Sequence, residues 1–308
     1  MDQLLSDSTA GDPMTGLKWT RKTLLALTRE LQKEFQVGHS TVARLLRQQG
    51  YALRTNRKRL SPRHDAQRDQ QFRYIARQRR CFARTKCPII SVDTKKKELI
   101  GLFKNAGRTW RRQPIDVFET DFAQDAKGKA IPYGIYDLSY NEGYVSVGLS
   151  HETSAFAVTA IRAWWLELGR YRYPGKHELL ILADSGGANG NWCWLWKWEL
   201  QQLADEFDLT ITVTHYPTGA SKWNPIEHRL FCHISHNWAG QPLVSYETML
   251  KFIRTTKTAT GLRCRARLDR KHYKTGLNIT IEQKHAVNFQ AHPTVPKFNY
   301  TIRPHSRQ

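Results

Sequence analysis

A run of five apolar residues that ends in an acid, residues 179–183 followed by Asp184, most tightly constrains the fold of this chain. A strand that is apolar on both sides is typical of a central position in an α/β sheet, where helices cover both faces. A second β-rich run, residues 88–93, also ends in an acid, Asp93. Open α/β sheets place their sites beyond the carboxyl ends of strands, so both acids are candidate site residues.

The remaining pattern predicts an α/β fold, a mixed sheet of five strands flanked by helices. Amphipathic helices are predicted before and after the strand that ends in Asp184. Residues 104–142 read as an irregular connection, and so long a connection is usually functional or an insertion. Asn224-Pro225 predicts a helix start, with Asn224 as the N-cap. The predicted strands are residues 88–93, 98–103, 143–149, 179–184 and 209–215.

A third acid, Glu227, lies in the first turn of that last helix and can lean over the same edge of the sheet. Three converging carboxylates repel one another unless cations lie between them, and magnesium suits oxygen ligands of this kind. Simpler explanations exist for each residue. An aspartate that ends a strand is often a turn residue or a helix cap, and Glu227 has the spacing of a capping box with Asn224.

Charge is distributed unevenly along the chain. Lysine and arginine number 48 against 27 aspartate and glutamate residues, a net charge of +21. The net charges of residues 1–87, 88–250 and 251–308 are +12, −2 and +11. A near-neutral middle with basic flanks suits an enzyme held on nucleic acid by its ends. An anionic membrane surface is the second choice of partner.

The basic N-terminal flank has the pattern of a helix-turn-helix. Thr20 can cap a first helix, and Ser40 can cap a second helix that ends at Gly50. Such a second helix enters the major groove of DNA, although an ordinary helical hairpin explains the pattern about equally well. Val42, Leu45 and Leu46 form its buried stripe. The candidate DNA contacts are Arg44, Arg47 and Gln48 on the exposed side and Arg57, Lys58 and Arg59 just beyond the helix.

Several classes of protein are disfavoured by what the sequence lacks. No apolar run approaches the roughly 18–20 residues that span a bilayer, and the N-terminus lacks the sections of a signal peptide. The five cysteines are scattered without C-x-x-C pairs and read as reduced thiols. We therefore expect a cytoplasmic protein with no membrane partner.

Four sequence blocks carry a resemblance to a known family: residues 90–101 (ISVDTKKKELIG), 129–134 (KAIPYG), 183–190 (ADSGGANG) and 221–231 (SKWNPIEHRLF). The chain resembles the DDE transposases of bacterial insertion sequences and, more narrowly, the ISAzo-type family, over about residues 17–303. The resemblance implies an RNase H-like catalytic domain in which Asp93, Asp184 and Glu227 are the catalytic, metal-binding triad.

The resemblance also implies cofactors and partners. Two Mg²⁺ ions, for which Mn²⁺ can substitute, would support cleavage of phosphodiester bonds at the ends of the element and strand transfer into target DNA. The partner would be double-stranded DNA, with the protein as a homodimer or larger assembly that is nucleoid-associated when bound. Lys95, Lys96 and Lys222 are candidate phosphate contacts. His215 and His228 could orient substrate or a carboxylate, although a structural histidine is the commoner case.

We expect five regions along the chain. Residues 1–16 are a disordered lead, the remnant of a longer N-terminus; 17–60 the helix-turn-helix; 61–87 a basic helical linker; 88–250 the catalytic domain; and 251–308 a basic C-terminal extension. Trp192 and Trp194 stand where the family usually has a basic residue, and Trp192 falls on the predicted buried stripe. The alternatives are a truncated or inactive copy that only binds DNA, and a structure-directed nuclease on the same fold.

Overall fold

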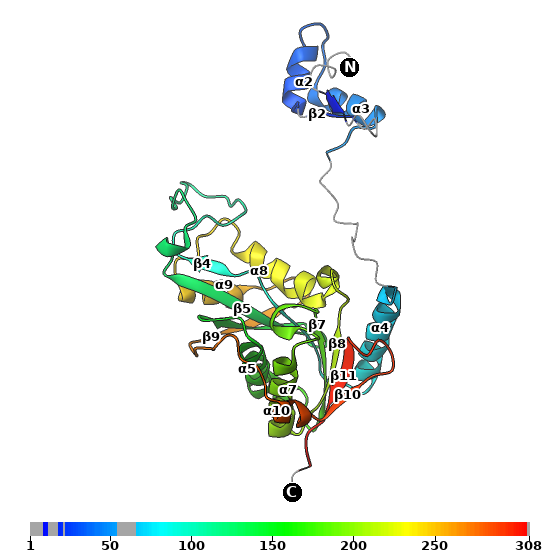
Figure 1. Cartoon of the computed structure of the whole chain (residues 1–308). Coiled ribbons are helices and arrows are strands. Elements are labelled where there is room, and N and C mark those ends of the chain that lie inside the picture. Colours follow the sequence, from blue (N-terminus) through cyan, green and yellow to red (C-terminus); the bar gives the residue numbers. More distant parts are fainter. Residues whose placement is uncertain (1–8, 12–17, 21, 54–65, 307–308) are drawn as a thin grey trace. The chain divides into compact units, whose positions relative to one another are not determined.

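The computed structural model describes residues 9–11, 18–20, 22–53 and 66–306, and the chain divides into two compact units, Met1–Leu60 and Ser61–Gln308 (Figure 1). Each unit has a buried apolar core of its own. Within the described ranges no helix is both long enough and apolar enough to cross a membrane.

The first unit contains the two predicted helices, α2 (Leu24–Leu31) and α3 (His39–Gln48), which pack around Leu27, Leu31 and Val42. The helix-turn-helix region was predicted to be all-α, but it also contributes a strand, because β1 (Thr9–Gly11) pairs antiparallel with β2 (Lys18–Thr20). Part of the lead that was predicted to be disordered, residues 1–16, therefore forms a strand, whose backbone hydrogen-bonding groups are satisfied by β2.

The two helices begin at other residues than the sequence suggested. Thr20 lies in β2, and the cap of α2 is Thr23, whose hydroxyl accepts a hydrogen bond from the Ala26 N–H at 3.1 Å. Helix α3 begins one residue before Ser40, after Gly38. Both cap residues, Thr23 and Gly38, have an extended backbone, as is usual immediately before the first helical turn.

The second unit is built on one large mixed sheet. Its strands are β3 (Ile89–Thr94), β4 (Glu98–Ile100), β5 (Gly128–Asp137), β6 (Glu142–Gly148), β7 (Glu178–Ala183), β8 (Thr210–His215), β9 (Arg263–Asp269), β10 (Phe289–Ala291) and β11 (Asn299–Ile302). Their order is β10-β11-β8-β7-β3-β5-β6-β9, and β4 pairs with β5. Strands β3, β7 and β8 are parallel neighbours, while β5 is antiparallel to β3.

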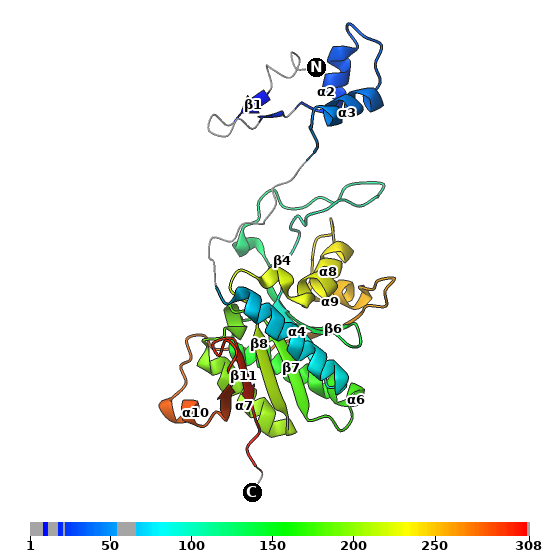
Figure 2. The same cartoon turned by 90° about the vertical axis from the view of Figure 1, so that its right-hand side faces the viewer.

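The helices of this unit connect the strands and cover the sheet (Figures 1 and 2). They are α4 (Arg68–Arg84), α5 (Ser154–Trp164), η2 (Trp165–Gly169), α6 (Arg170–Arg172), α7 (Trp194–Phe207), η5 (Glu227–Phe231), α8 (Cys232–Asn237), α9 (Tyr246–Thr255) and α10 (Ile281–His285), with single turns at η1 (Ala123–Asp125), η3 (Gly187–Asn189) and η4 (Ser221–Trp223).

The five predicted strands are all present, as β3, β4, β6, β7 and β8, but the sheet is larger than predicted. Strand β5 occupies residues 128–137, inside the segment predicted to be irregular. Strands β9, β10 and β11 come from residues 251–308, predicted to be an extension beyond the catalytic domain. Both ends of the sheet are therefore closed by C-terminal strands.

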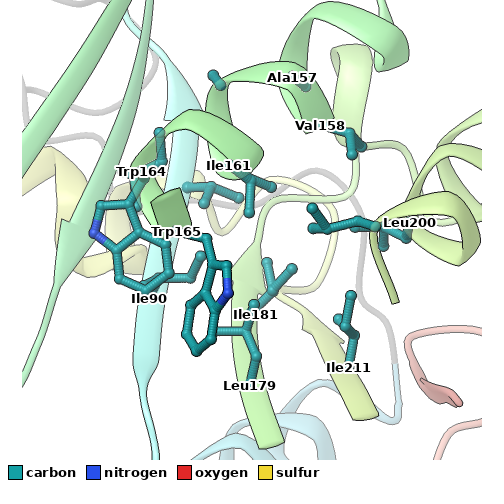
Figure 3. Packing of buried hydrophobic residues seen from close by; sticks show 14 of the residues in the cluster. Ile90, Ala157, Val158, Ile161, Trp164, Trp165, Leu179, Ile181, Leu200 and Ile211 are labelled. Atoms are coloured by element: carbon teal, nitrogen blue, oxygen red, sulfur yellow. The ribbon is translucent and has the colours of Figure 1, made fainter. Parts of the chain in front are cut away.

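Apolar side chains that point alternately to the two faces of the sheet form a hydrophobic core on each face. On one face, α5 and α7 pack against Ile90, Ile181 and Ile211 (Figure 3). On the other face, η5, α8 and α9 cover β5 and β6, and α4 covers the neighbouring part of the sheet through Ile75 and Phe82. Because successive side chains of a strand point to opposite faces, β7, the apolar strand predicted to be central, contributes side chains to the cores on both faces of the sheet.

Helix α4, predicted as a linker, is an integral part of this unit. Its buried face includes Gln71, whose amide donates to the His215 carbonyl at 2.9 Å and to Asn299 Oδ1 at 2.8 Å. The Asn299 amide donates back to Gln71 Oε1 at 2.6 Å. This buried pair joins α4 to β8 and β11, so a segment before the sheet and the last strand of the chain hold each other in place.

Candidate active site

Asp93 and Asp184 lie side by side at one edge of the sheet. In the parallel pair β3–β7, Ser91 is opposite Leu182, and two further residues along each strand lead to Asp93 and Asp184. Adjacent strands are roughly 4.8 Å apart, and residues in register point to the same face. The two aspartates predicted from the sequence therefore converge, which a role for each as an isolated turn residue would not require.

Glu227 is brought to the same edge by a hydrogen-bonded tie between its helix and β3. Ser91 Oγ donates to Asn224 Oδ1 at 2.5 Å and accepts from the Ile226 N–H at 3.0 Å. The Asn224 amide donates to the Val92 carbonyl at 3.1 Å. Asn224 was predicted to cap the helix, but its side chain points to β3 instead, and Ser91 satisfies the free N–H of the first turn.

Gly134 lets this helix approach the sheet closely. It is the residue of β5 directly opposite Asp93. A Cβ atom at Gly134 would lie 2.5 Å from the Phe231 ring and 2.9 Å from Ile226 Cδ1. The missing side chain therefore makes room for the π-helical turn Glu227–Phe231, a distortion often found at functional sites.

Burial is the main cause that raises the pKa of all three carboxylates. Burial, and after it the charge of Asp184, raises the pKa of Asp93. Burial also raises the pKa of Asp184, helped by the charges of Glu152 and Glu227. The pKa of Glu227 is raised by burial as well. None of the three forms an ion pair with another described residue.

Two residues near the trio were missed by the sequence reasoning. Glu152, just before α5, adds negative charge beside Asp184 and forms an ion pair with Lys97 at 2.8 Å. It follows a strand, as the two predicted aspartates do, so the same signal could have identified it. Ser91 gave no signal of its own, because a small polar residue within a strand has many possible roles.

The chemistry of this group fits a divalent cation. Carboxylate oxygens that are partly or fully buried, lie close to one another and form no ion pair with a described residue are stabilised by a hard cation such as Mg²⁺. The side chains are not gathered into a finished cluster, since no three His, Cys, Asp or Glu residues in the described ranges are arranged as a metal site. Asp93 and Asp184 are nevertheless oriented by backbone, with Oδ1 atoms that accept from the Thr94 N–H at 2.8 Å and the Gly186 N–H at 3.3 Å.

The three lysines predicted to contact phosphate differ in exposure. Lys96 and Lys222 are exposed. Lys95 is buried, forms an ion pair with Glu98 at 2.9 Å and lies 4.5 Å from the centre of the Trp238 ring. Lys95 is therefore occupied by partners within the protein, where its charge lowers the pKa of Glu227. Its location does not favour direct contact with phosphate.

In the first unit, Arg44, Arg47 and Gln48 are exposed on α3, as a DNA-reading helix requires. Arg57, Lys58 and Arg59 lie outside the described residues.

His215 supports the backbone of Asp184. Its Nδ1 donates to the Asp184 carbonyl at 2.7 Å, and its Nε2 lies 3.1 Å from the Tyr300 hydroxyl, which accepts from Trp196 Nε1 at 2.9 Å. Because a carbonyl only accepts, Nδ1 carries the proton and Nε2 accepts from Tyr300. Burial lowers the pKa of His215 to about 4, so the ring is neutral. The side chain of His228 forms a hydrogen bond with the Lys222 carbonyl.

The tryptophans of residues 192–198 take different environments. Trp192 is 71% exposed, not buried as predicted, because it precedes the first turn of α7 and the helical stripe does not reach it. Trp194 packs against Phe289 at 5.7 Å between ring centres, and Lys197 and Lys284 lie over its ring. Trp196 is fully buried.

The chain matches a protein family described as the Rhodopirellula transposase DDE domain over residues 1–304. A search of curated proteins found no match. Similar solved structures include a Mos1 transposase paired-end complex with the left transposon end (16% identity, 78% of this chain and 72% of that chain, TM-score 0.45). A pre-cleavage Mos1 transpososome (16%, 78% and 72%, 0.47) and a mariner Mos1 paired-end complex with Mg (15%, 79% and 73%, 0.47) are also similar.

The family match spans nearly the whole chain and confirms the resemblance seen in the four sequence blocks. The mixed sheet, with helices on both faces and acids at the ends of adjacent parallel strands, is the RNase H-like architecture that the resemblance implied. The chain belongs to the transposase DDE domain family and is a DDE-type DNA transposase.

Proposed function

We propose that this transposase cuts phosphodiester bonds at the ends of its insertion sequence and joins the freed 3′-hydroxyl to target DNA, using Asp93, Asp184 and Glu227. The observation that carries the proposal is the register of β3 and β7, which puts Asp93 beside Asp184 while Ser91 and Asn224 tie the Glu227 helix to the same edge. Both steps are in-line displacements at phosphorus, so one site can serve both.

The three carboxylates would hold Mg²⁺, two ions by family resemblance, with Mn²⁺ as a substitute. When bound, such ions supply Lewis-acid catalysis and lower the pKa of the attacking water or hydroxyl. The contribution of the chain's own residues is to hold the carboxylates and the DNA in position. The Thr94 and Gly186 N–H groups fix two carboxylates, and Lys96 and Lys222 are exposed where a phosphate backbone would need neutralising charge.

The experiment is cleavage of labelled duplex that carries the element's own end, with Mg²⁺ or with EDTA, by the wild-type chain and by Asp184→Asn. We expect cutting at the end only with Mg²⁺ and only by the wild type, with DNA affinity unchanged in the variant. Cleavage retained by Asp184→Asn would overturn the assignment of the site. A duplex with a scrambled end is the control, and equal cutting of both would indicate a structure-directed nuclease.

We further propose that the protein acts as at least a dimer, because two ends must be held together for a single insertion event. Light scattering of the protein with end DNA tests this proposal. A complex of one chain and one DNA end that still carries out paired strand transfer would contradict it. Its binding to DNA would place the protein on the nucleoid.

A further inference from the structure

One side of α4 carries a row of arginines. Arg73, Arg77, Arg80 and Arg84 are spaced by four, three and four residues, which puts them on one face of the helix, and all four are exposed. The opposite face is buried against the sheet through Ile75 and Phe82. We call these four residues the arginine stripe, and Figure 2 shows α4, the helix that carries it, lying across strands β7 and β8.

The arginine stripe is not neutralised by neighbouring acids. Arg73 forms an exposed ion pair with Asp69 at 2.7 Å, and such pairs contribute little. Arg77, Arg80 and Arg84 form no ion pair with any described carboxylate. Elsewhere in the unit, Arg162 and Arg172 are paired with glutamates. Like charges three or four residues apart on a helix repel one another, and a polyanion bound along them would relieve this repulsion.

A hollow beside the stripe gives a ligand room to approach. It has a volume of about 510 Å³ and lies between α4 and the β5–β6 turn, where Arg79, Arg80 and Ser139 line it. Ala76 and Ala83, seven residues apart on the helix, also line the hollow, and their short side chains leave room in it. The hollow is bordered by guanidinium and hydroxyl donors, the groups that most often contact DNA phosphates.

The stripe also has a suitable length and direction. From Arg73 to Arg84 the helix rises about 16 Å, which spans roughly five phosphates of one strand of B-DNA. The N-terminal end of α4 lies next to the active site, because Phe72 packs against Trp223 at 6.1 Å, four residues before Glu227. A duplex that follows the stripe would therefore extend away from the carboxylates.

We propose that the arginine stripe and the adjacent hollow bind the sugar-phosphate backbone of double-stranded DNA, independently of the helix-turn-helix. The proposal rests on the proposed function for its partner and adds a second DNA-binding surface to it. Positive charge repeated along an exposed helix suits the regular phosphates of a duplex, so we expect the contribution of the stripe to be independent of sequence.

The test is the salt dependence of binding by the full chain to a duplex that lacks the element's end, measured in EDTA so that no cleavage is needed. The variant is Arg77→Gln/Arg80→Gln/Arg84→Gln, in which glutamine preserves helix propensity. The matched control removes three exposed charges elsewhere on the same unit, Lys251→Gln/Arg263→Gln/Lys274→Gln. Circular dichroism and the melting temperature confirm that both variants are folded.

We expect the slope of log affinity against log salt to fall by roughly 2.7 in the stripe variant, since each lost phosphate contact removes about 0.9. The control variant should retain the wild-type slope. A loss below about 0.9, or an equal loss in the control, overturns the proposal. An equal loss of binding to polyglutamate would assign the stripe to acidic chains in general and overturn the assignment to DNA.

A second measurement uses a thiol that the chain already has. Cys81 is exposed on α4 between Arg80 and Arg84, whereas Cys264 is buried and serves as the internal reference. We expect duplex DNA to slow alkylation of Cys81 severalfold in the wild type and not in the stripe variant. Equal alkylation rates with and without DNA would contradict the proposal, whatever the outcome of the Asp184→Asn cleavage test.

Discussion

The carboxylate edge, formed by Asp93, Asp184 and Glu227, and the arginine stripe of α4 are built in opposite ways. The carboxylates are largely buried, and hydrogen bonds from backbone and from Asn224, Ser91 and His215 hold the segments that carry them. The arginines are exposed, and three of the four form no ion pair with a described residue. The difference matches the two proposed roles, because chemistry at phosphorus requires fixed positions, whereas attraction to a phosphate backbone requires only charge.

The largest effect should come from the carboxylate edge itself. In Glu227→Gln, the rate of end cleavage should fall by about 10³-fold, because several kcal/mol of transition-state stabilisation is lost and each 1.36 kcal/mol is worth tenfold. Affinity for end DNA should stay within about twofold of the wild type. The stripe variant, in contrast, should lose affinity in a salt-dependent way. Single-turnover cleavage and equilibrium binding measure the two quantities. A variant that loses affinity instead of rate would erase the contrast between the two regions.

A substitution that disturbs the close packing beneath Glu227 should have the second-largest effect on the cleavage rate. In Gly134→Ala the new Cβ would clash with Phe231 and Ile226, which shifts the helix and destabilises the fold by about 1–3 kcal/mol. A displacement near 1 Å can lower the cleavage rate by about 10²-fold. The control is Gly38→Ala, where a Cβ meets no atom within 4 Å. Denaturant unfolding and cleavage rate should both change in the first variant and neither in the second.

The hydroxyl of Ser91 should have a smaller effect. Ser91→Ala leaves the Asn224 carbonyl and the Ile226 N–H without their partner and should cost about 1–3 kcal/mol of unfolding free energy. Ser146 is an equally buried serine on the neighbouring part of the sheet whose hydroxyl has no partner in the described structure. Ser146→Ala should therefore be neutral or stabilising. Equal losses in the two variants would show that the tie to β3 does not stabilise the site.

The smallest effect should come from one arginine of the stripe. Arg80→Gln removes like-charge repulsion with Arg77 and Arg84, so unfolding free energy should rise by about 0.2–0.5 kcal/mol for each relieved pair. The salt slope for duplex binding should fall by about 0.9. Thermal unfolding at low salt and a binding titration test the two predictions. A loss of stability would mean that Arg80 has a structural partner and would weaken the comparison.

The sequence located Asp93 and Asp184 at the ends of strands because strand alternation and strand ends are local signals. The run of residues 179–183 reads as a buried strand without knowledge of its neighbours, and Asp184 follows from it. Strand β5 could not be recognised in the same way. It contains Gly128, Pro132 and Gly134, residues that disfavour strands in general. In the structure Gly134 is required because a helix from far along the chain packs against it.

Residues 263–269 show a signal that was present but not used. Cys264 and Ala266 are buried and alternate with exposed Arg263 and Arg265, the pattern of a strand with one solvent-exposed face. Ser91 and Asn224 differ, because their roles depend on a contact between residues more than 130 positions apart. No local pattern reports such a contact, and a local rule assigned Asn224 to capping instead.

The support of Asp184 by His215 and Tyr300 has a consequence for biosynthesis. Tyr300 belongs to the last strand, β11, which also carries Asn299, the partner of Gln71. A ribosome must therefore translate the chain through β11 before the segment that carries Asp184 acquires its final support, long after α2 and α3 have emerged. An early stop codon would leave a polypeptide that still contains α2 and α3 but lacks the strand that supports the proposed cleavage site.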